Sequence, residues 1–291
     1  MMGRAKDRVH EAVLSGRPID FAPVIDCHAH FGPWSNTVVP DSLDYLSVLR
    51  AMDAWGTDLV IFSASQPGYG GAVAQANDHV IDFVKRAPDR IMGYCTLSAH
   101  CPERSLAELQ RCYEAGLRLG VKMHRYHQPE YKITDAFLDP IFEFLNERHL
   151  IYINHVLGTM EELRTAAERW PDVTFVNGHG SIEIASLAHS VPNVRANVCA
   201  MIFYRDIARL VEAHGSRNLL LGSDFNLFQP GFGIGPVAFA EIPEEDKRNI
   251  LGLNAIELMK HMEWYRSDGP PARLSRYSSA SADCACRRDR D

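Results

Sequence analysis

Short runs of apolar residues recur along the chain, and each is followed by a segment in which apolar residues return every three or four positions. The short runs predict buried β-strands, and the longer spacing predicts amphipathic helices packed against them. Parallel strands need a crossover helix between them, so regular alternation of the two patterns indicates a parallel sheet. The runs that predict strands fall at residues 24–25, 59–62, 91–96, 120–124, 150–154, 173–176, 194–198 and 219–224.

Eight strand–helix units predict an α/β fold whose sheet closes into a single-domain (β/α)8 barrel of the TIM type. An open, doubly wound sheet is the alternative, but no glycine-rich phosphate loop follows the first strand. The expected organisation is an N-terminal extension over residues 1–20, a metal-dependent barrel domain over 21–265 and a disordered tail over 266–291. The tail is marked by two prolines, a serine-rich run and a charged end.

Caps and breakers set the expected helix boundaries. The first barrel helix is expected to begin at Asp41 or Ser42 and to run to about Trp55. The closing helix is expected over residues 244–262. The segment 229–233 is expected to be a loop, because glycine and proline alternate in it.

Composition narrows the class of protein. The 291 residues carry a formal net charge of -7, which argues against nucleic acid or an anionic membrane as a partner. No apolar run is long enough to predict a transmembrane helix, and the first twenty residues lack the apolar core of a signal peptide. Seven cysteines, an odd number without regular spacing, favour a reducing cytoplasm over a disulfide framework. We therefore expect a cytoplasmic protein.

Histidines and one aspartate gather where the predicted strands end. His28 and His30 lie two residues apart on the first strand, so both imidazoles project from the same face. In a (β/α)8 barrel the active site lies at the carboxyl ends of the strands. Histidine nitrogens and one carboxylate form the ligand set of a catalytic zinc site, although an imidazole pair alone does not select the metal. The other polar side chains at these ends are Lys122 and His124 after the fourth strand, His155 after the fifth, His179 after the sixth and Asp224 after the eighth.

The motifs at these positions resemble those of the amidohydrolase superfamily, in the branch that contains aminocarboxymuconate-semialdehyde decarboxylase. The resemblance implies that His28, His30, His155 and Asp224 bind one divalent metal, expected to be Zn2+, and that His179 acts beside the metal-bound water or the substrate. A bound cation lowers the pKa of its water toward about 7, and Asp224 or His179 can accept the released proton. The resemblance covers about residues 24–259 and rests on the order and spacing of IDCHAH (25–30), APDRIMGY (87–94), GVKMH (120–124), PDVTFVNGHG (171–180), LLLGSDF (219–225) and LGLNAIELM (251–259).

Three residues near the fourth strand each have two interpretations. Lys122 could become a carboxylated bridge to a second metal held by His155 and His179, as in some binuclear amidohydrolases, or it could bind a substrate carboxylate. His124 is either part of the wall of the substrate site or a structural histidine. Arg125 is either a clamp for a carboxylate or a solvated loop arginine.

Residues on the rim and on the first strand add further candidates. Tyr69 and Phe232 each lie in a Gln-Pro-Gly-aromatic-Gly segment and are expected to contact substrate as part of a lid, with ordinary turns as the alternative. Asp26 shares the face of His28 and could orient its ring from behind. Cys27 is expected to point away from both histidines.

The first functional hypothesis is a metal-dependent hydrolase that uses a metal-activated water to cleave a C–N or C–O bond, of the amide or lactone type, in a small carboxylated molecule. The H-x-H pair suits hydrolases and decarboxylases of the family equally, so a nonoxidative decarboxylase is the alternative. That reaction requires an arginine for the departing carboxylate, Arg125 or Arg205, and a proton donor such as His179. A non-catalytic barrel that binds a small molecule is a second alternative. Dimers are common among the proteins that the chain resembles, so a homodimer is one expectation.

Overall fold

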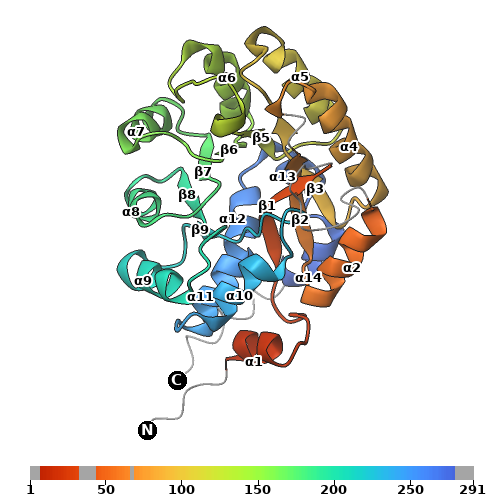
Figure 1. The fold of residues 1–291 in the computed structure, drawn as a ribbon, viewed down its shortest axis with the longest axis vertical. Helices are drawn as coiled ribbons and strands as arrows, with labels where there is room; N and C mark the ends of the chain where they lie inside the picture. Colours follow the sequence, from red (N-terminus) through yellow and green to blue (C-terminus); the bar gives the residue numbers. More distant parts are fainter. Residues whose placement is uncertain (1–6, 33–43, 66–68, 279–291) are drawn as a thin grey trace.

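A ring of parallel strands enclosed by helices forms the centre of the protein (Figure 1). The computed structural model describes residues 7–32, 44–65 and 69–278. Every strand pair within the described residues is parallel. The strands are β1 (Ile25–Phe31), β2 (Leu59–Ala64), β3 (Ile91–Gly93), β4 (Cys95–Thr96), β5 (Gly120–Met123), β6 (Ile151–Asn154), β7 (Thr174–Asn177), β8 (Val194–Asn197) and β9 (Leu219–Leu220).

The predicted third strand is present as the two short strands β3 and β4, which are separated by Tyr94. β3 pairs with β2 and β4 pairs with β5, so the ladders divide into a three-stranded and a six-stranded sheet. Backbone hydrogen bonds join the two sheets at both places where their edges meet. Leu119 N–H donates to the carbonyl of Gly93 (3.4 Å), and Cys27 N–H donates to the carbonyl of Leu221 (2.9 Å). The strands therefore occupy eight positions around one axis, and the predicted (β/α)8 barrel is confirmed.

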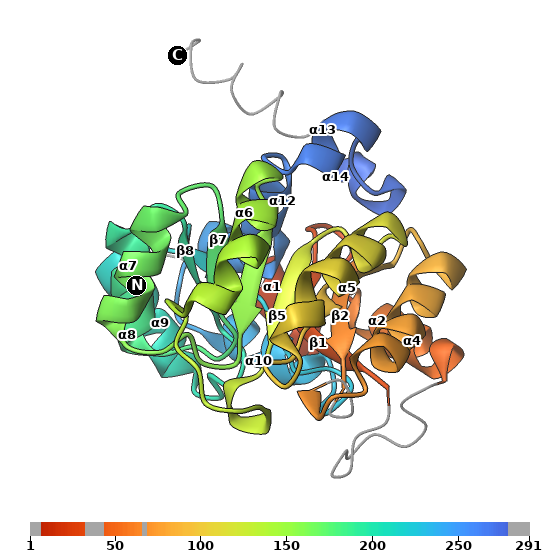
Figure 2. The ribbon, with the colours of Figure 1, turned by 90° about the horizontal axis from the view of Figure 1, so that it is seen from above.

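Helices surround the strands, as two perpendicular views show (Figures 1 and 2). The apolar side of each amphipathic helix is buried against the ring, as Val80 and Phe83 are on α4. None of the described helices is long and apolar enough to cross a membrane. The helices are α1 (Arg8–Leu14), α2 (Tyr45–Trp55), α4 (Val73–Arg86), α5 (Pro102–Glu114), α6 (Asp139–Glu147), α7 (Met160–Arg169), α8 (Ile182–Ser190), α9 (Tyr204–His214), α10 (Gly231–Phe239), α11 (Glu244–Arg248), α12 (Asn254–Met259), α13 (Glu263–Asp268) and α14 (Ser275–Ser278).

Several boundaries differ from the sequence expectation. α2 is capped by Asp44, whose carboxylate accepts from Leu46 N–H (2.9 Å), while the expected caps Asp41 and Ser42 lie outside the described residues. The segment 229–233 was expected to be a loop, but α10 begins inside it at Gly231. The closing helix is α11 and α12 joined by a π-helical turn, Asn249–Leu253. β1 extends to Phe31, so both histidines lie inside the strand rather than after it.

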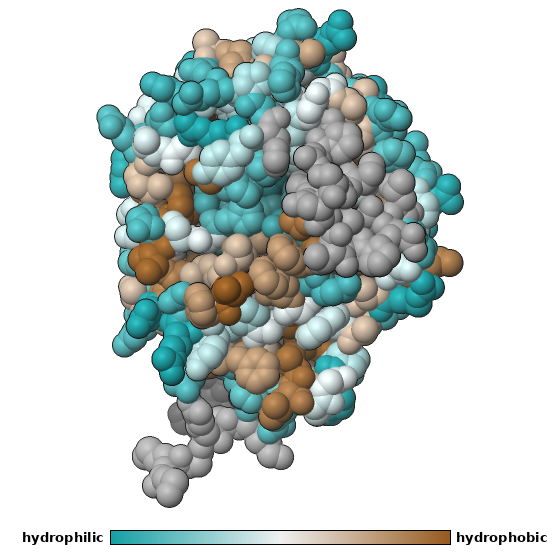
Figure 3. Space-filling view, in the orientation of Figure 1, coloured by the Kyte–Doolittle hydropathy of each residue, from teal (hydrophilic) through white to brown (hydrophobic). Residues whose placement is uncertain are grey.

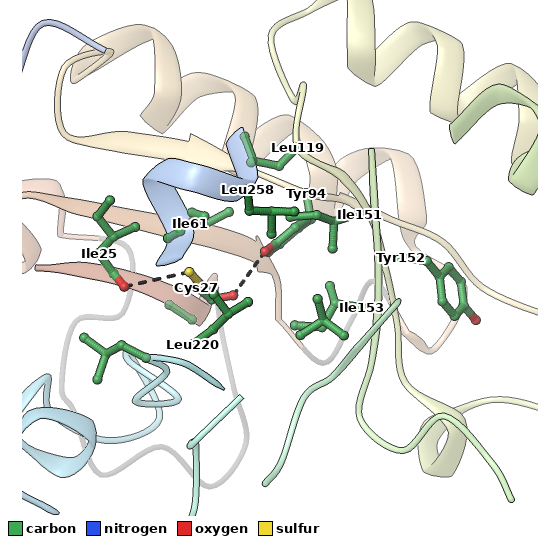
Figure 4. Packing of buried hydrophobic residues seen from close by; sticks show 14 of the residues in the cluster. Ile25, Cys27, Ile61, Tyr94, Leu119, Ile151, Tyr152, Ile153, Leu220 and Leu258 are labelled. Carbon is green, nitrogen blue, oxygen red and sulfur yellow. Dashed lines mark hydrogen bonds between the residues drawn. The ribbon is translucent and has the colours of Figure 1, made fainter. Parts of the chain in front are cut away.

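The barrel interior beneath the histidines is apolar. Figure 4 shows Ile25, Ile61, Ile153 and Leu220 packed around Cys27. The hydroxyl of Tyr94 donates to the carbonyl of Cys27 (3.2 Å), which satisfies a polar group in this apolar setting. Cys27 Sγ lies 3.8 Å from the carbonyl of Ile25, so the thiol belongs to the core and not to the polar edge above it.

The C-terminal segment is folded further than predicted. Disorder was expected from residue 266, but helical structure continues to Ser278 and Leu274 is buried. The segment is held by Asp58, a fully buried carboxylate next to β2. Asp58 accepts from Arg273 Nε (3.2 Å), from the Arg276 guanidinium and from the Tyr277 hydroxyl (3.0 Å). Residues 279–291 lie outside the described residues.

Replacing Asp58 by alanine is expected to lower the free energy of unfolding by about 1–3 kcal/mol, since Val24 N–H and two guanidinium groups lose a buried acceptor. Chemical denaturation measures this change. The control Asp268→Ala removes an exposed ion pair with Arg118 and should cost less than about 1 kcal/mol. Similar losses in the two variants would contradict the anchoring role of Asp58.

Candidate metal and catalytic site

The side chain of His28 is held in one orientation by a backbone carbonyl from the opposite wall of the barrel. His28 Nδ1 lies 2.7 Å from the carbonyl oxygen of Gly178, and the ring is buried. A carbonyl only accepts, so the proton of a neutral His28 is on Nδ1 and the lone pair is on Nε2. Burial lowers the pKa of His28 well below its ordinary value, which favours that neutral form. Nε2 is therefore presented to the cavity as a ligand atom.

Asp224 faces the ligand atoms of both histidines from β1. Its Oδ1 lies 3.4 Å from His28 Nε2 and 3.3 Å from His30 Nε2. Burial would raise the pKa of Asp224, but the adjacent histidines hold it below its usual range, so the group is a carboxylate. The residue adopts a φ of +57°, and its N–H donates to the carbonyl of His28 (2.9 Å), which ties it to β1.

This arrangement suits a cation. Asp224 Oδ1 is buried and has no hydrogen-bond partner among the described residues, and it faces the lone pair of His28 Nε2 at 3.4 Å. Two ligands about 2.0–2.2 Å from one zinc-like ion, at tetrahedral angles, are themselves about 3.3–3.6 Å apart. The spacing between these atoms therefore matches what a shared divalent ion requires, and the positive group next to them in this structure is Lys122, whose Nζ lies 2.7 Å from His28 Nε2.

His30 is held from the side away from Asp224. Its Nδ1 lies 3.0 Å from Ser63 Oγ and 3.3 Å from the Tyr69 hydroxyl. Tyr69 was expected on a lid, but the structure buries it completely against His30, and burial raises the pKa of its hydroxyl. Tyr69 therefore contacts a predicted ligand directly. The preceding residues 66–68 of that loop lie outside the described residues.

His179 lies beside the carboxylate and close to two other histidines. Its Nε2 is 3.9 Å from Asp224 Oδ2, and its ring centroid is 5.1 Å from that of His28 and 4.2 Å from that of His155. Burial lowers the pKa of His179 to about 4. The imidazole is therefore neutral near pH 7, with one ring nitrogen that carries a proton and one that accepts.

His155 and His124 form the next part of the wall. Their rings stack with centroids 4.1 Å apart, and His124 also lies 5.0 Å from the ring of Tyr69. Burial lowers the pKa of His155 to about 3, so this ring is neutral too. The donor atoms that all lie within 4.8 Å of one another belong to His28, His179, Cys199 and Asp224. His155 stays a predicted ligand that this structure orients toward other rings.

Lys122 is fully buried and points at the same cluster. Its Nζ lies 2.7 Å from His28 Nε2, and burial lowers its pKa to about 8. Removal of a lysine from water favours the neutral amine, the form that carboxylation by carbon dioxide needs. The carboxylated bridge and the alternative role in carboxylate binding both stay predictions.

The remaining predicted contacts lie farther from the cluster. Arg125 begins a short helical turn after β5, is half-buried, and donates its backbone N–H to Asn154 Oδ1 (3.2 Å). Phe232 belongs to α10 and stacks on Phe228 with centroids 4.3 Å apart, so it is part of a helix rather than a glycine-hinged loop. Arg205 is exposed at the start of α9.

Three buried asparagines at the ends of consecutive strands hold the loops that carry the site. Asn154 ends β6 next to His155, Asn177 ends β7 and bonds the carbonyl of His179, and Asn197 ends β8 and accepts from Cys199 N–H (2.8 Å). These asparagines and Cys199 were not among the residues expected at the site. An asparagine one or two residues before a polar residue, repeated on three strands, was the available signal.

Asp26 acts differently from its predicted role. It was expected to orient the His28 ring, but its carboxylate accepts from the backbone N–H groups of His28 and Ser223 (3.1 Å each) and from the Ser223 hydroxyl. Burial raises the pKa of Asp26 to about 7. The residue therefore joins β1 to the segment that bears Asp224, while Gly178 orients the ring.

The site opens on the face that carries the carboxyl ends of the strands. Figure 3 shows a hydrophilic hollow near the centre of that face, with hydrophobic residues along part of its border. The exposed apolar residues at this edge of the barrel are Ile182, which begins α8, and Ile202 and Phe203, which lie between β8 and α9. A small polar molecule with an apolar body fits such a setting.

The chain resembles known proteins in sequence and in structure. The sequence profile described as amidohydrolase matches residues 25–260. A 2-amino-3-carboxymuconate-6-semialdehyde decarboxylase from Dictyostelium discoideum is 25% identical over 240 residues, which cover 63% of this chain and 65% of that protein. The chain thus spans about two thirds of the length of this curated relative.

Solved structures with the same fold include two decarboxylases. The 2,6-dihydroxybenzoate decarboxylase from Rhizobium has a TM-score of 0.65 at 14% identity, over 82% of this chain and 99% of that one. The 5-carboxyvanillate decarboxylase from Novosphingobium aromaticivorans, in complex with manganese and a nitrobenzoic acid, has a TM-score of 0.62 at 16% identity, over 83% and 97%. At these identities the likeness demonstrates the barrel fold.

The expectation of a hydrolase that cleaves C–N or C–O bonds is wrong. The curated relative is a decarboxylase, and so are these structural neighbours. The H-x-H pair and the barrel are common to both reaction types, so the motif that prompted the hydrolase hypothesis does not distinguish them. The stated alternative, a carbon–carbon lyase, agrees with the relatives.

Replacing Gly178 by alanine is expected to reduce metal affinity by about tenfold or more, because an added Cβ would lie 2.8 Å from His28 Cε1 and 3.2 Å from Lys122 Nζ. Metal titration with elemental analysis measures the effect. Gly235→Ala is the matched control, since nothing lies within 4 Å of its added Cβ. Unchanged affinity in Gly178→Ala would show that the His28 orientation does not govern the site.

Proposed function

The chain belongs to the amidohydrolase family, and we propose that it catalyses the metal-dependent, nonoxidative decarboxylation of a small unsaturated or aromatic carboxylic acid. The observation that carries the proposal is the match to a decarboxylase over 240 residues. The barrel neighbours that act on carboxylated aromatics support the substrate class. The hydrophilic hollow with apolar borders agrees with a planar acid.

We propose that His28, His30, His155 and Asp224 hold one divalent ion. The spacing of Asp224 Oδ1 from the Nε2 atoms of His28 (3.4 Å) and His30 (3.3 Å) supports this assignment. When bound, such an ion supplies positive charge that orients an anionic substrate and stabilises charge developing on it. Zinc is our proposed metal, although the neighbour from Novosphingobium aromaticivorans is described with manganese.

In the proposed reaction the bond between the substrate carbon and its carboxylate breaks. The electron pair stays on that carbon, carbon dioxide leaves, and one proton takes the place of the carboxylate. His179 is the proposed proton donor in its imidazolium form, because its Nε2 lies 3.9 Å from Asp224 Oδ2 and this carboxylate favours the protonated ring. The imidazolium gives one proton to the substrate carbon and returns to the neutral ring that burial favours, and it takes up another proton from solvent before the next turnover.

The proposal also requires a cation for the substrate carboxylate. Lys122 is buried within the cluster, and Arg125 is half-buried at the end of β5, so both are positioned near the hollow. Arg205 was the other candidate, but its exposed position on α9, with the guanidinium over the ring of Tyr204, suits solvent better. We assign the role to Arg125 and Lys122 together.

Purified full-length protein, incubated with a panel of hydroxybenzoic and unsaturated dicarboxylic acids, is expected to release carbon dioxide that is detected by a coupled assay. Metal per chain, measured on the same preparation without chelators, is expected to be about one. Two ions per chain would favour the Lys122 bridge. Release of amines or alcohols from amide and lactone substrates, without carbon dioxide, would overturn the proposal, and no turnover across the panel would favour a binding protein.

The ligand and proton-donor assignments predict different effects. His28→Ala and Asp224→Asn are expected to lose bound metal and carbon dioxide release together. His179→Ala is expected to retain metal but lose activity by about a hundredfold or more. Elemental analysis and the coupled assay measure the two quantities on one sample. Loss of metal from His179→Ala would make this residue a ligand instead of the proton donor.

A further inference from the structure

A cysteine that the proposed function does not use lies within the same donor cluster. Cys199 follows β8 at the carboxyl edge of the barrel and is completely buried. Its N–H donates to Asn197 Oδ1 (2.8 Å), and its carbonyl accepts from Gly180 N–H (3.1 Å). Hydrogen bonds on both sides of the residue therefore fix the backbone from which the thiol projects.

The sulfur lies among the groups that suit a cation. Cys199 Sγ and the ligand atoms of His28, His179 and Asp224 all lie within 4.8 Å of one another. His28 and Asp224 are proposed ligands, and His179 is the proposed proton donor beside them, so Cys199 would add a further ligand to the proposed set. Asp224 Oδ1 is also buried without a hydrogen-bond partner among the described residues, and it faces the Nε2 atoms of His28 (3.4 Å) and His30 (3.3 Å). A sulfur about 2.3 Å from an ion lies about 3.3–3.8 Å from nitrogen or oxygen ligands of the same ion, so small side-chain shifts would let Cys199 join His28 and Asp224.

We propose that Cys199 is a thiolate ligand of the bound metal and gives this site a preference for Zn2+ or Co2+ over Mn2+. The inference rests on the proposed divalent metal site and extends it to a residue that the family resemblance does not include. As the sulfur–metal bond forms, the thiol releases its proton to solvent, and no oxidation occurs.

Sulfur in the ligand set changes which metal is favoured. Thiolates are soft donors that suit zinc, whereas manganese is suited to carboxylate, carbonyl and water oxygens. The manganese described in two structural neighbours is therefore not expected to be the best metal here.

The other described cysteines do not compete for this role. Cys27 lies in the apolar core, and Cys95 and Cys112 lie near Glu108 between β4 and α5. Cys101 precedes α5 and is half-buried. Cys284 and Cys286 fall outside the described residues, so they need a control of their own.

Cobalt replacement tests the proposal by absorption spectroscopy. Full-length protein stripped with a chelator and loaded with one equivalent of Co2+ is expected to show a thiolate-to-cobalt charge-transfer band in the near ultraviolet. The band is expected to disappear in Cys199→Ser and to persist in Cys101→Ser and in the double variant Cys284→Ser/Cys286→Ser. The ratio of Zn2+ to Mn2+ affinity is expected to fall by about tenfold or more in Cys199→Ser only.

X-ray absorption of the zinc-loaded Cys284→Ser/Cys286→Ser protein gives an answer that does not depend on whether Cys199→Ser folds. One sulfur neighbour at about 2.3 Å from zinc supports the proposal. A shell of nitrogen and oxygen alone, or a cobalt band unchanged in Cys199→Ser, would overturn it. These readouts need no turnover, so failure of the decarboxylase proposal leaves them interpretable, and failure to bind any metal would overturn both.

Discussion

One hydrogen bond across the barrel controls the site. The carbonyl of Gly178, after β7, accepts from His28 Nδ1 on β1, and this contact determines which ring nitrogen faces Asp224. If His28 took the other tautomer, its Nε2 would carry a proton and could not act as a ligand. The closed barrel is necessary for this contact, since β1 and the loop after β7 are far apart in sequence but lie on the same edge.

The loops around that contact are shaped by hydrogen bonds from strand ends to backbone. Asn154 and Asn177 lie at strand ends and accept from the main chain of a neighbouring loop. Asn197 accepts from Cys199 N–H in its own loop and donates to the carbonyl of Leu221 (3.3 Å) after β9. Buried amides of this kind limit the positions that His155, His179 and Cys199 can take. The site is thus built on strand ends whose buried amide side chains are hydrogen-bonded.

The sequence was sufficient for the barrel because alternating strand and helix spacing is a local signal that repeats eight times. It also pointed to His28, His30, His179 and Asp224 as candidates, which the structure brings together, since each directly follows or interrupts an apolar run. It did not point to Cys199, because one cysteine after a strand has no pattern of its own. The course of residues 266–278 depends on Asp58, which is more than two hundred residues away in the sequence. The type of reaction was also not predictable, because hydrolases and decarboxylases of this fold share the same metal-ligand motif.

The anchoring of the C-terminal segment has a consequence for biosynthesis. Asp58 and Arg276 are 218 residues apart, so the carboxylate beside the second strand has no guanidinium partner until nearly the whole barrel has left the ribosome. Contacts of such long range form late, because the intervening chain must be ordered first. A nascent chain that has passed residue 224 therefore still lacks this contact, which lies at the end of the barrel that carries the amino ends of the strands (Figure 2).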